Sequence, residues 1–477
     1  MSLCWIGKLI DMKKHLLSIT LVLGCFTGSI GVSATADATP GYTGNTAKLA
    51  FRNHLPGLSA EQKLDFTVGK GFFKRIWVSA PASTQAADGL GPLYNARSCI
   101  ACHPNNGRGK PPENNTEKAK SMVLKIDIPA QTKAQQGLLA KYETNNIPEP
   151  VYGLQLQNFA VAGHESESEL KVSYREVPVT LSDGEVVMLR KPVYQVNNLS
   201  YGKLHPDTRF SPRVAPQLIG LGLLDAIDEQ ELIALVDEED RDGNGISGKL
   251  NRVWSREYAK VMPGRFGYKS GSPSVNEQSQ SAFFTDIGIS TPLYPEGYGD
   301  CMTAQRDCIA APDGNSPQFD NLEAPRQVTE LVDFYVSNIA PPPQRNREHE
   351  DVKAGRALFE QIGCSGCHVP TFDVTHNNRR QQIHPYTDLL LHDMGEGLAD
   401  HRPEGLASGS EWRTAPLWGI GLSPAVSGHS YYLHDGRARS LMEAILWHGG
   451  EAQKQRDAVV ALDKRQRAQL LKFIESI

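Results

Sequence analysis

The sequence predicts a mostly α-helical fold built from two related domains, the first of which contains a large insertion with a small β-hairpin. The pattern Cys-x-x-Cys-His occurs twice, at residues 99–103 and 364–368. An amphipathic segment with apolar residues at helical spacing follows each copy, at residues 330–339 and 469–477. Because the same motif recurs with the same closing helix, we infer that the chain repeats one structural unit.

The Cys-x-x-Cys-His pattern is the attachment sequence of a c-type haem. Two thiols bond to the porphyrin, and the imidazole that follows becomes the proximal ligand of the iron. The predicted attachment residues are Cys99, Cys102 and His103 in the first copy and Cys364, Cys367 and His368 in the second. The alternatives are a zinc site closed by both cysteine pairs and a redox dithiol. A histidine follows each pair and no strand precedes either, so the sequence favours two covalently bound haem c groups in cytochrome c-like domains.

The first residues, 1–36, have the pattern of a signal peptide. Lys13 and Lys14 precede an apolar run, and small residues at 34–36 offer a cleavage site. The alternatives are lipid modification of Cys25 and a membrane anchor, although the apolar run is short for a span. Export to the periplasm agrees with haem attachment, which takes place outside the cytoplasm. No segment after the signal peptide is predicted to cross a membrane.

The remaining chain divides at a polar linker. The first haem domain is predicted over residues 37–343, the linker over 344–350 and the second haem domain over 351–477. Three prolines precede the linker and cannot continue a helix. In the second domain, Gly355 and Phe359 lie on one face of the helix that leads into the motif. This pairing suits a close crossing with the C-terminal helix.

The insertion in the first domain supplies a hairpin and a disulfide. Strand-like residues 171–174 and 186–189 flank a Ser-Asp-Gly turn at 182–184. Cys301 and Cys308 are the two cysteines left over from the leader and the motifs. In an oxidising compartment we expect them to form a disulfide, and two free reactive thiols are the alternative.

Charge and length limit the class of protein. The 477 residues include 49 basic and 54 acidic side chains, and the formal net charge of -5 is spread along the chain. This distribution gives no surface for nucleic acid. The length is sufficient for two domains that each bury a core.

The sixth ligand of each iron decides the function, because a haem with two protein ligands carries electrons and an open one binds peroxide or oxygen. For the second haem the candidates are His392, Met394, His434 and His448. A histidine on an apolar helix, as at 448, is more often a packed core residue, whereas a thioether ligand is common in cytochromes. For the first haem no residue stands out, and His164 and His205 are the candidates.

Peroxide cleavage also needs an acid–base group that moves a proton from the inner to the outer oxygen. Gln157 lies close in sequence to three acids at alternate positions, Glu165, Glu167 and Glu169. Taken alone, such a run is more typical of a solvated face.

Residues 240–246 match the start of a calcium-binding loop. Asp240, Asp242, Asn244 and the backbone of Ile246 offer oxygen ligands at alternate positions. The twelfth position is Asn251 where the pattern expects glutamate. An Asx-rich turn without an ion is the alternative, and we favour calcium.

Six motifs between residue 89 and the chain end carry a family resemblance. They are Gly-Leu-Gly-Pro at 89–92, Ser-Pro-Arg-Val-Ala-Pro at 211–216, Gly-Arg-Phe-Gly at 264–267, the segment 388–395, Glu-Trp-Arg-Thr at 411–414 and the segment 433–439. On these motifs the chain resembles the di-haem oxidoreductase family, sometimes labelled thiol oxidoreductases. This family is related to the bacterial di-haem cytochrome c peroxidases and, more distantly, to rubber-cleaving di-haem oxygenases.

The resemblance implies a division of labour between the haems. In the peroxidase relatives the N-terminal haem reacts with peroxide, the C-terminal haem supplies an electron, and calcium lies between the domains. Their spacing places the sixth ligand of the second haem at His448 where they have methionine, a change that lowers the haem potential. Their distal glutamine and glutamate map onto Gln157 and Glu167.

We therefore predict a periplasmic di-haem oxidoreductase that reduces hydrogen peroxide. Its predicted partners are a small-molecule oxidant, either peroxide or oxygen, and a periplasmic electron-donor protein. Two alternatives stay open: an electron carrier with both irons six-coordinate, and an oxygenase or oxidase that acts on an organic or protein substrate.

Overall fold

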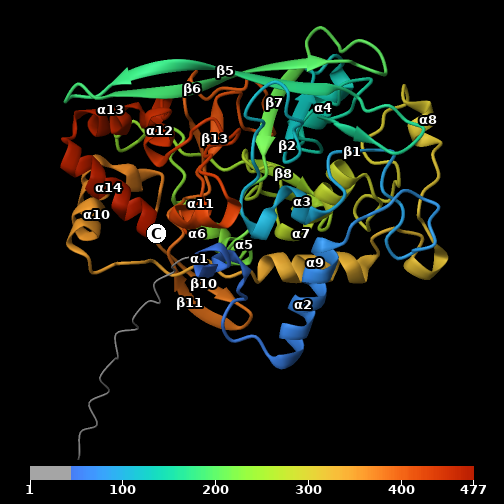
Figure 1. The fold of residues 1–477 in the computed structure, drawn as a ribbon, viewed down its shortest axis with the longest axis horizontal. Coiled ribbons are helices and arrows are strands. Elements are labelled where there is room, and N and C mark those ends of the chain that lie inside the picture. Colours follow the sequence, from blue (N-terminus) through green and yellow to red (C-terminus); the bar gives the residue numbers. More distant parts are fainter. Residues whose placement is uncertain (1–44) are drawn as a thin grey trace, which may run out of the picture. The chain divides into compact units, whose positions relative to one another are not determined.

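The computed structural model describes residues 45–477, and its longest helices form two crossed pairs (Figure 1). Helix α2 (Ala60–Lys74) packs across α9 (Arg326–Ser337), and α10 (Glu350–Ile362) packs across α14 (Lys464–Ser476). Each pair combines a helix that precedes one Cys-x-x-Cys-His motif with a helix that follows it.

A glycine at each crossing lets the two helices approach closely. A Cβ on Gly69 would lie 2.0 Å from the carbonyl oxygen of Leu331, and one on Gly355 would lie 1.9 Å from that of Gln469. Any side chain at either position would collide with the backbone of the partner helix. The two crossings therefore depend on the same residue type for the same reason.

The ends of these helices satisfy their free backbone groups locally. Ser59 and Gln62 form a capping box at the start of α2, and Asp463 and Gln466 form one at the start of α14. Helix α10 ends at Gly363, whose φ of +89° is the left-handed conformation typical of a glycine C-cap.

The other elements are short, apart from one hairpin. The remaining α-helices are α1 (Asn45–Lys48), α3 (Cys99–Cys102), α4 (Lys133–Ala140), α5 (Leu221–Asp225), α6 (Glu229–Ala234), α7 (Val275–Ala282), α8 (Arg306–Ile309), α11 (Ser423–Ser427), α12 (Leu441–Leu446) and α13 (Gln453–Ala461). The strands are β1 (Leu93–Tyr94), β2 (Met122–Asp127), β3 (Gln155–Leu156), β4 (Phe159–Ala160), β5 (Glu169–Thr180), β6 (Val186–Asn197), β7 (Arg209–Val214), β8 (Arg252–Ser255), β9 (Lys260–Pro263), β10 (Phe372–His376), β11 (Arg379–Ile383), β12 (Leu391–Asp393) and β13 (Glu411–Arg413).

The strands form small antiparallel sheets. β2 is the centre of a three-stranded sheet in the order β3-β2-β7, and the other sheets have two strands each: β1-β4, β5-β6, β8-β9, β10-β11 and β12-β13. β5 and β6 pair over twelve residues and extend along the top of the view in Figure 1.

This long hairpin reaches from the first half of the chain to the second. At its turn, Asp183 and Glu185 form ion pairs with Arg467 of α14. Along β6, the hydroxyl of Tyr194 donates to Oδ2 of Asp435 at 2.9 Å. The insertion therefore contacts the surroundings of the second motif as well as its own half.

The prediction of a mostly α-helical fold with two cytochrome c-like domains is wrong. Over the described residues the structure is 31% helical and 20% strand, with several small sheets. The helices predicted around each motif are present, but the prediction overlooked the strands. Most of these strands are only two to six residues long. Strands this short in a Pro- and Gly-rich chain leave too few alternating residues for a period-two pattern to be recognised.

None of the helices in the described range 45–477 is long and apolar enough to cross a membrane. The predicted signal peptide at 1–36 and the alternative lipid site at Cys25 lie outside the described residues.

Candidate haem-binding cavity

Both Cys-x-x-Cys-His motifs line one cavity of about 910 Å³. In the first motif the single turn α3 joins Cys99 to Cys102, and in the second a 3₁₀ turn begins at Cys364. In each, the amide of the motif histidine donates to the carbonyl of the first cysteine at 3.0 Å. One cavity therefore receives all the predicted attachment residues.

The two motif histidines are oriented in the same way. Nδ1 of His103 lies 2.7 Å from the carbonyl oxygen of Pro216, and Nδ1 of His368 lies 2.9 Å from that of Tyr386. A carbonyl only accepts, so each Nδ1 carries the proton and each Nε2 keeps its lone pair. Burial lowers the pKa of both histidines to about 4, so both are neutral. These are the properties that an iron-ligating imidazole needs.

The motif cysteines fit thioether attachment better than a zinc site. Burial raises the pKa of Cys99 and of Cys364 to about 12, which disfavours the thiolates that zinc requires. Within residues 45–477, the only grouping of metal-ligating atoms found is Cys367 with Asp388 and His392, so the two cysteine pairs do not converge.

His448 lies beside the second motif. It follows α12, lines the cavity, and has Nδ1 at 2.8 Å from the carbonyl oxygen of Ala444, which leaves Nε2 available. It is also close enough to His368 to lower the pKa of that histidine electrostatically. Met394 lines the same cavity from the loop after β12.

The other candidate histidines have different environments. His392 lies between two carboxylates, with Nε2 2.8 Å from Asp388 and Nδ1 2.8 Å from Glu451. Burial alone would lower the pKa of His392, but the hydrogen bonds, led by that to Asp388, raise it to about 12. Both ring nitrogens are therefore occupied. His164 and His205 are not among the residues that line the cavity.

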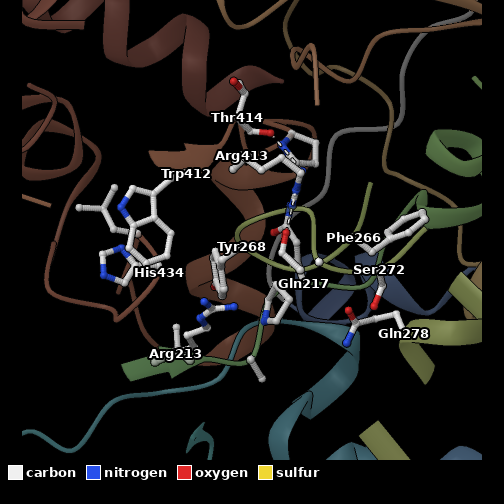
Figure 2. A pocket seen from close by; sticks show the side chains of 18 of the residues that line it. Arg213, Gln217, Phe266, Tyr268, Ser272, Gln278, Trp412, Arg413, Thr414 and His434 are labelled. Atoms are coloured by element: carbon white, nitrogen blue, oxygen red, sulfur yellow. Dashed lines mark hydrogen bonds between the residues drawn. The ribbon is translucent and has the colours of Figure 1, made fainter. Parts of the chain in front are cut away.

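His434 belongs to an aromatic and cationic cluster in the cavity wall (Figure 2). Its ring stacks on Trp412 with 3.8 Å between centroids and 12° between planes. The ammonium of Lys269 lies 4.5 Å from the same indole ring and pairs with Asp400 at 2.7 Å. Arg213, from β7, is 5.9 Å from the ring. Segments far apart in the chain thus converge on one tryptophan.

The predicted distal pair comes together behind the cavity wall. Oε2 of Glu167 accepts from the amide of Gln157 at 2.7 Å, and Oε1 accepts from Nε2 of Gln305 at 2.5 Å. Burial raises the pKa of Glu167 well above its usual range. Neither Glu167 nor Gln157 is among the residues that line the cavity.

Four other polar residues face the cavity near the first motif. We call Lys125, Gln155, Asp286 and Asp300 the polar compartment. Gln155 donates to Oδ1 of Asp286 at 2.7 Å, and Asp286 raises the pKa of Cys99, which places the compartment next to the motif. Sequence reasoning missed these residues, and the available signals were weak: Gln155 is two residues from a predicted glutamine and Asp300 precedes a predicted disulfide.

A family model described as "Di-haem oxidoreductase, putative peroxidase" matches residues 30–477. The chain belongs to this family. The predicted family is thereby confirmed. Among solved structures, a chain of hydrazine synthase from Kuenenia stuttgartiensis, pressurised with 20 bar xenon, is 18% identical, and the alignment covers 42% of this chain and 70% of that one with a TM-score of 0.23. That score is too low to indicate a shared fold. No curated protein matches the chain.

In this di-haem oxidoreductase the predicted calcium loop is exposed and folded on itself. The carboxylate of Asp240 accepts from the amide of Gly245, Asp242 from that of Asn244, and Asn244 from that of Ile246. A Cβ on Gly366 of the second motif would lie 2.5 Å from Cδ1 of Ile246. The loop therefore touches the second attachment motif.

Cys301 and Cys308 of the di-haem oxidoreductase form a disulfide with 6.4 Å between their Cα atoms. The loop that it closes contains Gln305, the donor to Glu167, and directly follows Asp300 of the polar compartment. The disulfide loop therefore connects Glu167, the predicted acid, with Asp300 in the cavity wall.

Proposed function

We propose that this di-haem oxidoreductase is an exported peroxidase that reduces hydrogen peroxide beside the first motif and receives electrons through the second. One contrast supports the proposal. His448 lines the cavity on the side of the second motif and keeps Nε2 available, and the acid nearest Cys367, Asp388, is paired with His392, whereas the polar compartment lines the cavity near the first motif. A ligated iron suits electron transfer, and an iron that faces acids and amides suits oxygen chemistry.

Haem, when bound covalently at both motifs, would supply the iron chemistry. The chain would supply the rest: Pro216 and Tyr386 fix the proximal imidazoles, and His448 is the proposed sixth ligand of the second iron, with Met394 as the rival. The overall reaction joins hydrogen peroxide, two electrons and two protons to give two molecules of water. A periplasmic donor protein is the proposed source of the electrons.

Proton transfer to peroxide is proposed to take place where the polar compartment lines the cavity, near the first motif. A group held near a peroxide oxygen accelerates cleavage by moving a proton between the two oxygens. Glu167 and Gln157, the pair that the family resemblance implies, are proposed to support this proton movement from behind the wall, where Nε2 of Gln157 donates at 2.8 Å to the carbonyl oxygen of Thr285, a residue that lines the cavity. Calcium in the loop at 240–246 is proposed to stiffen the chain where Ile246 meets the second motif.

Low-temperature electron paramagnetic resonance of the oxidised di-haem protein tests the contrast. We expect one high-spin and one low-spin ferric signal, together with peroxide turnover in the presence of a reduced donor. Two low-spin signals that persist after one-electron reduction, with no turnover, would support an electron carrier and reject the proposal.

A further inference from the structure

The strongest unassigned feature of the cavity is the carboxyl group of Asp300. We propose that Asp300 is the catalytic acid–base group of this protein, the side chain that exchanges a proton with peroxide beside the first motif. The inference rests on the proposed peroxidase function and deepens it, because it assigns the proton transfer to a residue in the cavity wall.

The backbone holds Asp300 in a shaped cradle. Its Oδ2 accepts from the amides of Leu154 at 2.6 Å and Gln155 at 3.2 Å. A Cβ on Gly153 would lie 2.5 Å from that same oxygen, and Gly153 has a φ of +72°. Only glycine leaves room for the carboxylate there. The other oxygen, Oδ1, accepts none of the hydrogen bonds found among the described residues. One oxygen is therefore fixed and the other remains available.

A second polar atom in the same wall lacks a partner. Oε1 of Gln155 is buried and receives no hydrogen bond, although the side chain is only 1% exposed and lines the cavity. A buried amide oxygen without a donor is costly. A hydroperoxide or water O–H bound beside Asp300 would satisfy it.

The electrostatic surroundings suit proton exchange near neutral pH. Burial raises the pKa of Asp300. The two backbone amides and the positive charges of Lys125 and Arg402 lower it, but burial has the larger effect, and the pKa is about 7. Glu167 faces Asp300 from behind the wall, and the charge of Asp300 raises the pKa of Glu167. A group whose pKa lies near the working pH is well suited to both take and return a proton.

Geometry favours Asp300 over its two acidic neighbours. Both oxygens of Glu167 already accept hydrogen bonds, and that residue does not line the cavity. Asp286 also lines the cavity, but its Oδ1 accepts from the side chains of Gln155 and Thr285, whereas Oδ2 of Asp300 is held by two backbone amides that fix its orientation. In the proposed step the carboxylate of Asp300 takes a proton from one peroxide oxygen and returns it to the other. The O–O bond then breaks with water as the leaving group, and the second oxygen takes up two electrons from the donor protein and two protons from solvent to give the second molecule of water.

The decisive experiment compares Asp300→Asn with Glu323→Gln in the full-length di-haem protein. Glu323 is a matched control: it is buried, its pKa is also raised to about 7 by burial, and it accepts from the amides of Ser290 and Gly314, but it does not line the cavity. We expect Asp300→Asn to lower peroxide turnover by about 10²- to 10⁴-fold and to remove the limb of the pH profile near 7, with both haem spectra retained. Glu323→Gln should keep turnover within about twofold and the same pH profile.

A second variant covers the case in which Asp300→Asn disturbs folding. Gly153→Ala keeps the acid but displaces it from its cradle, so turnover should fall while both haem spectra persist. If either correctly folded variant keeps the wild-type turnover and pH profile, Asp300 is not the acid–base group.

Infrared difference spectroscopy separates this inference from the wider function. Several buried carboxyl groups contribute to the C=O intensity that titrates near pH 7, Glu323 among them, so the signal of interest is the part of the band that Asp300→Asn removes and Glu323→Gln keeps. Loss of this part in Asp300→Asn supports the proton-exchanging group whether or not peroxide is turned over. A wild type without peroxide turnover would reject the peroxidase function alone. An unchanged band in Asp300→Asn would reject the inference alone.

Discussion

The two haem motifs have nearly the same local support and different neighbours. Each follows a helix whose glycine touches the backbone of a closing helix, and each histidine donates through Nδ1 to a carbonyl. Even the aromatic contact recurs, with Phe73 at 6.4 Å from His103 and Phe359 at 6.2 Å from His368, measured between ring centroids. The support explains how haem would be held, but it cannot explain how two haems would differ.

The difference arises outside the repeated unit. On the side of the second motif, His448 lines the cavity from the turn that follows the short helix α12. The first motif has the polar compartment, whose members come from β2, β3, the short helical segment Phe283–Ile287 and the residue directly before Cys301. In the proposed function, residues outside the repeated helix pair, and not the pair itself, would therefore assign the chemistry of each motif.

The largest effects are expected when one proximal histidine is removed at a time, which tests whether the two motifs have different roles. We expect His103→Gly to reduce peroxide turnover to background and to leave the low-spin signal of the second haem, because the iron that meets peroxide loses its ligand. His368→Gly should instead leave a first haem that binds peroxide but receives no electrons.

His401→Gly is the control for these two variants. His401 is 68% exposed and has a positive φ of 57°, which glycine accepts without strain. It should behave as wild type in both spectra and turnover. Equal loss of turnover and of both haem signals in His103→Gly would show that the two sites are not independent.

The next test exchanges the proposed sixth ligand. His448→Met should raise the potential of the second haem by on the order of 100 mV, within the roughly 0.8 V range that axial ligands span, because methionine ligation favours the reduced iron. Potentiometric titration of both haems measures the shift, and the first haem should stay unchanged.

Met394→Leu separates the rival ligand from His448. If His448 is the ligand, this variant keeps the low-spin signal. Loss of that signal in Met394→Leu, together with its survival in His448→Met, would move the assignment to Met394.

A smaller effect is expected from the two helix crossings. Gly69→Ala and Gly355→Ala should each lower the free energy of unfolding by about 1–3 kcal/mol, since the added Cβ would overlap a backbone carbonyl and force the helices apart. Chemical denaturation measures both. Gly71→Ala, also in α2, has nothing within 4 Å of the added Cβ and should be stabilising by about 0.5–1 kcal/mol. A harmless alanine at 69 or 355 would mean that the crossings are not close.

The sequence was informative where chemistry depends on adjacent residues. The family could be recognised because a few residue types at fixed spacing identify it, and it is confirmed by the match over residues 30–477. The two attachment motifs stay a prediction from the same kind of spacing. The fold class was wrong, because the short strands leave almost no periodic pattern and are stabilised by pairing with distant segments.

The polar compartment was missed for a similar reason. Oδ2 of Asp300 accepts from the amide of Leu154, which lies 146 residues away in the chain. No local pattern connects such residues, and only the folded backbone brings them together. Glu167 could be proposed only from the resemblance to the peroxidase relatives, and that resemblance gives no indication that the acid lies behind the wall.

The smallest expected effect tests whether the insertion also supports the second motif. Tyr194 of β6 donates to Asp435, which Arg437 also holds at 2.9 Å. Tyr194→Phe should therefore lower the free energy of unfolding by only about 1 kcal/mol, because the buried carboxylate keeps its cationic partner. Tyr258→Phe is the control, since Tyr258 is 56% exposed and should give no change. Because Asp435 directly follows His434 in the cavity wall, we also expect a small shift in a haem spectrum of Tyr194→Phe. If Tyr194→Phe loses stability but leaves both haem spectra unchanged, the hairpin has only a structural role at the second motif. The difference between the two motifs would then depend on the polar compartment and His448 alone.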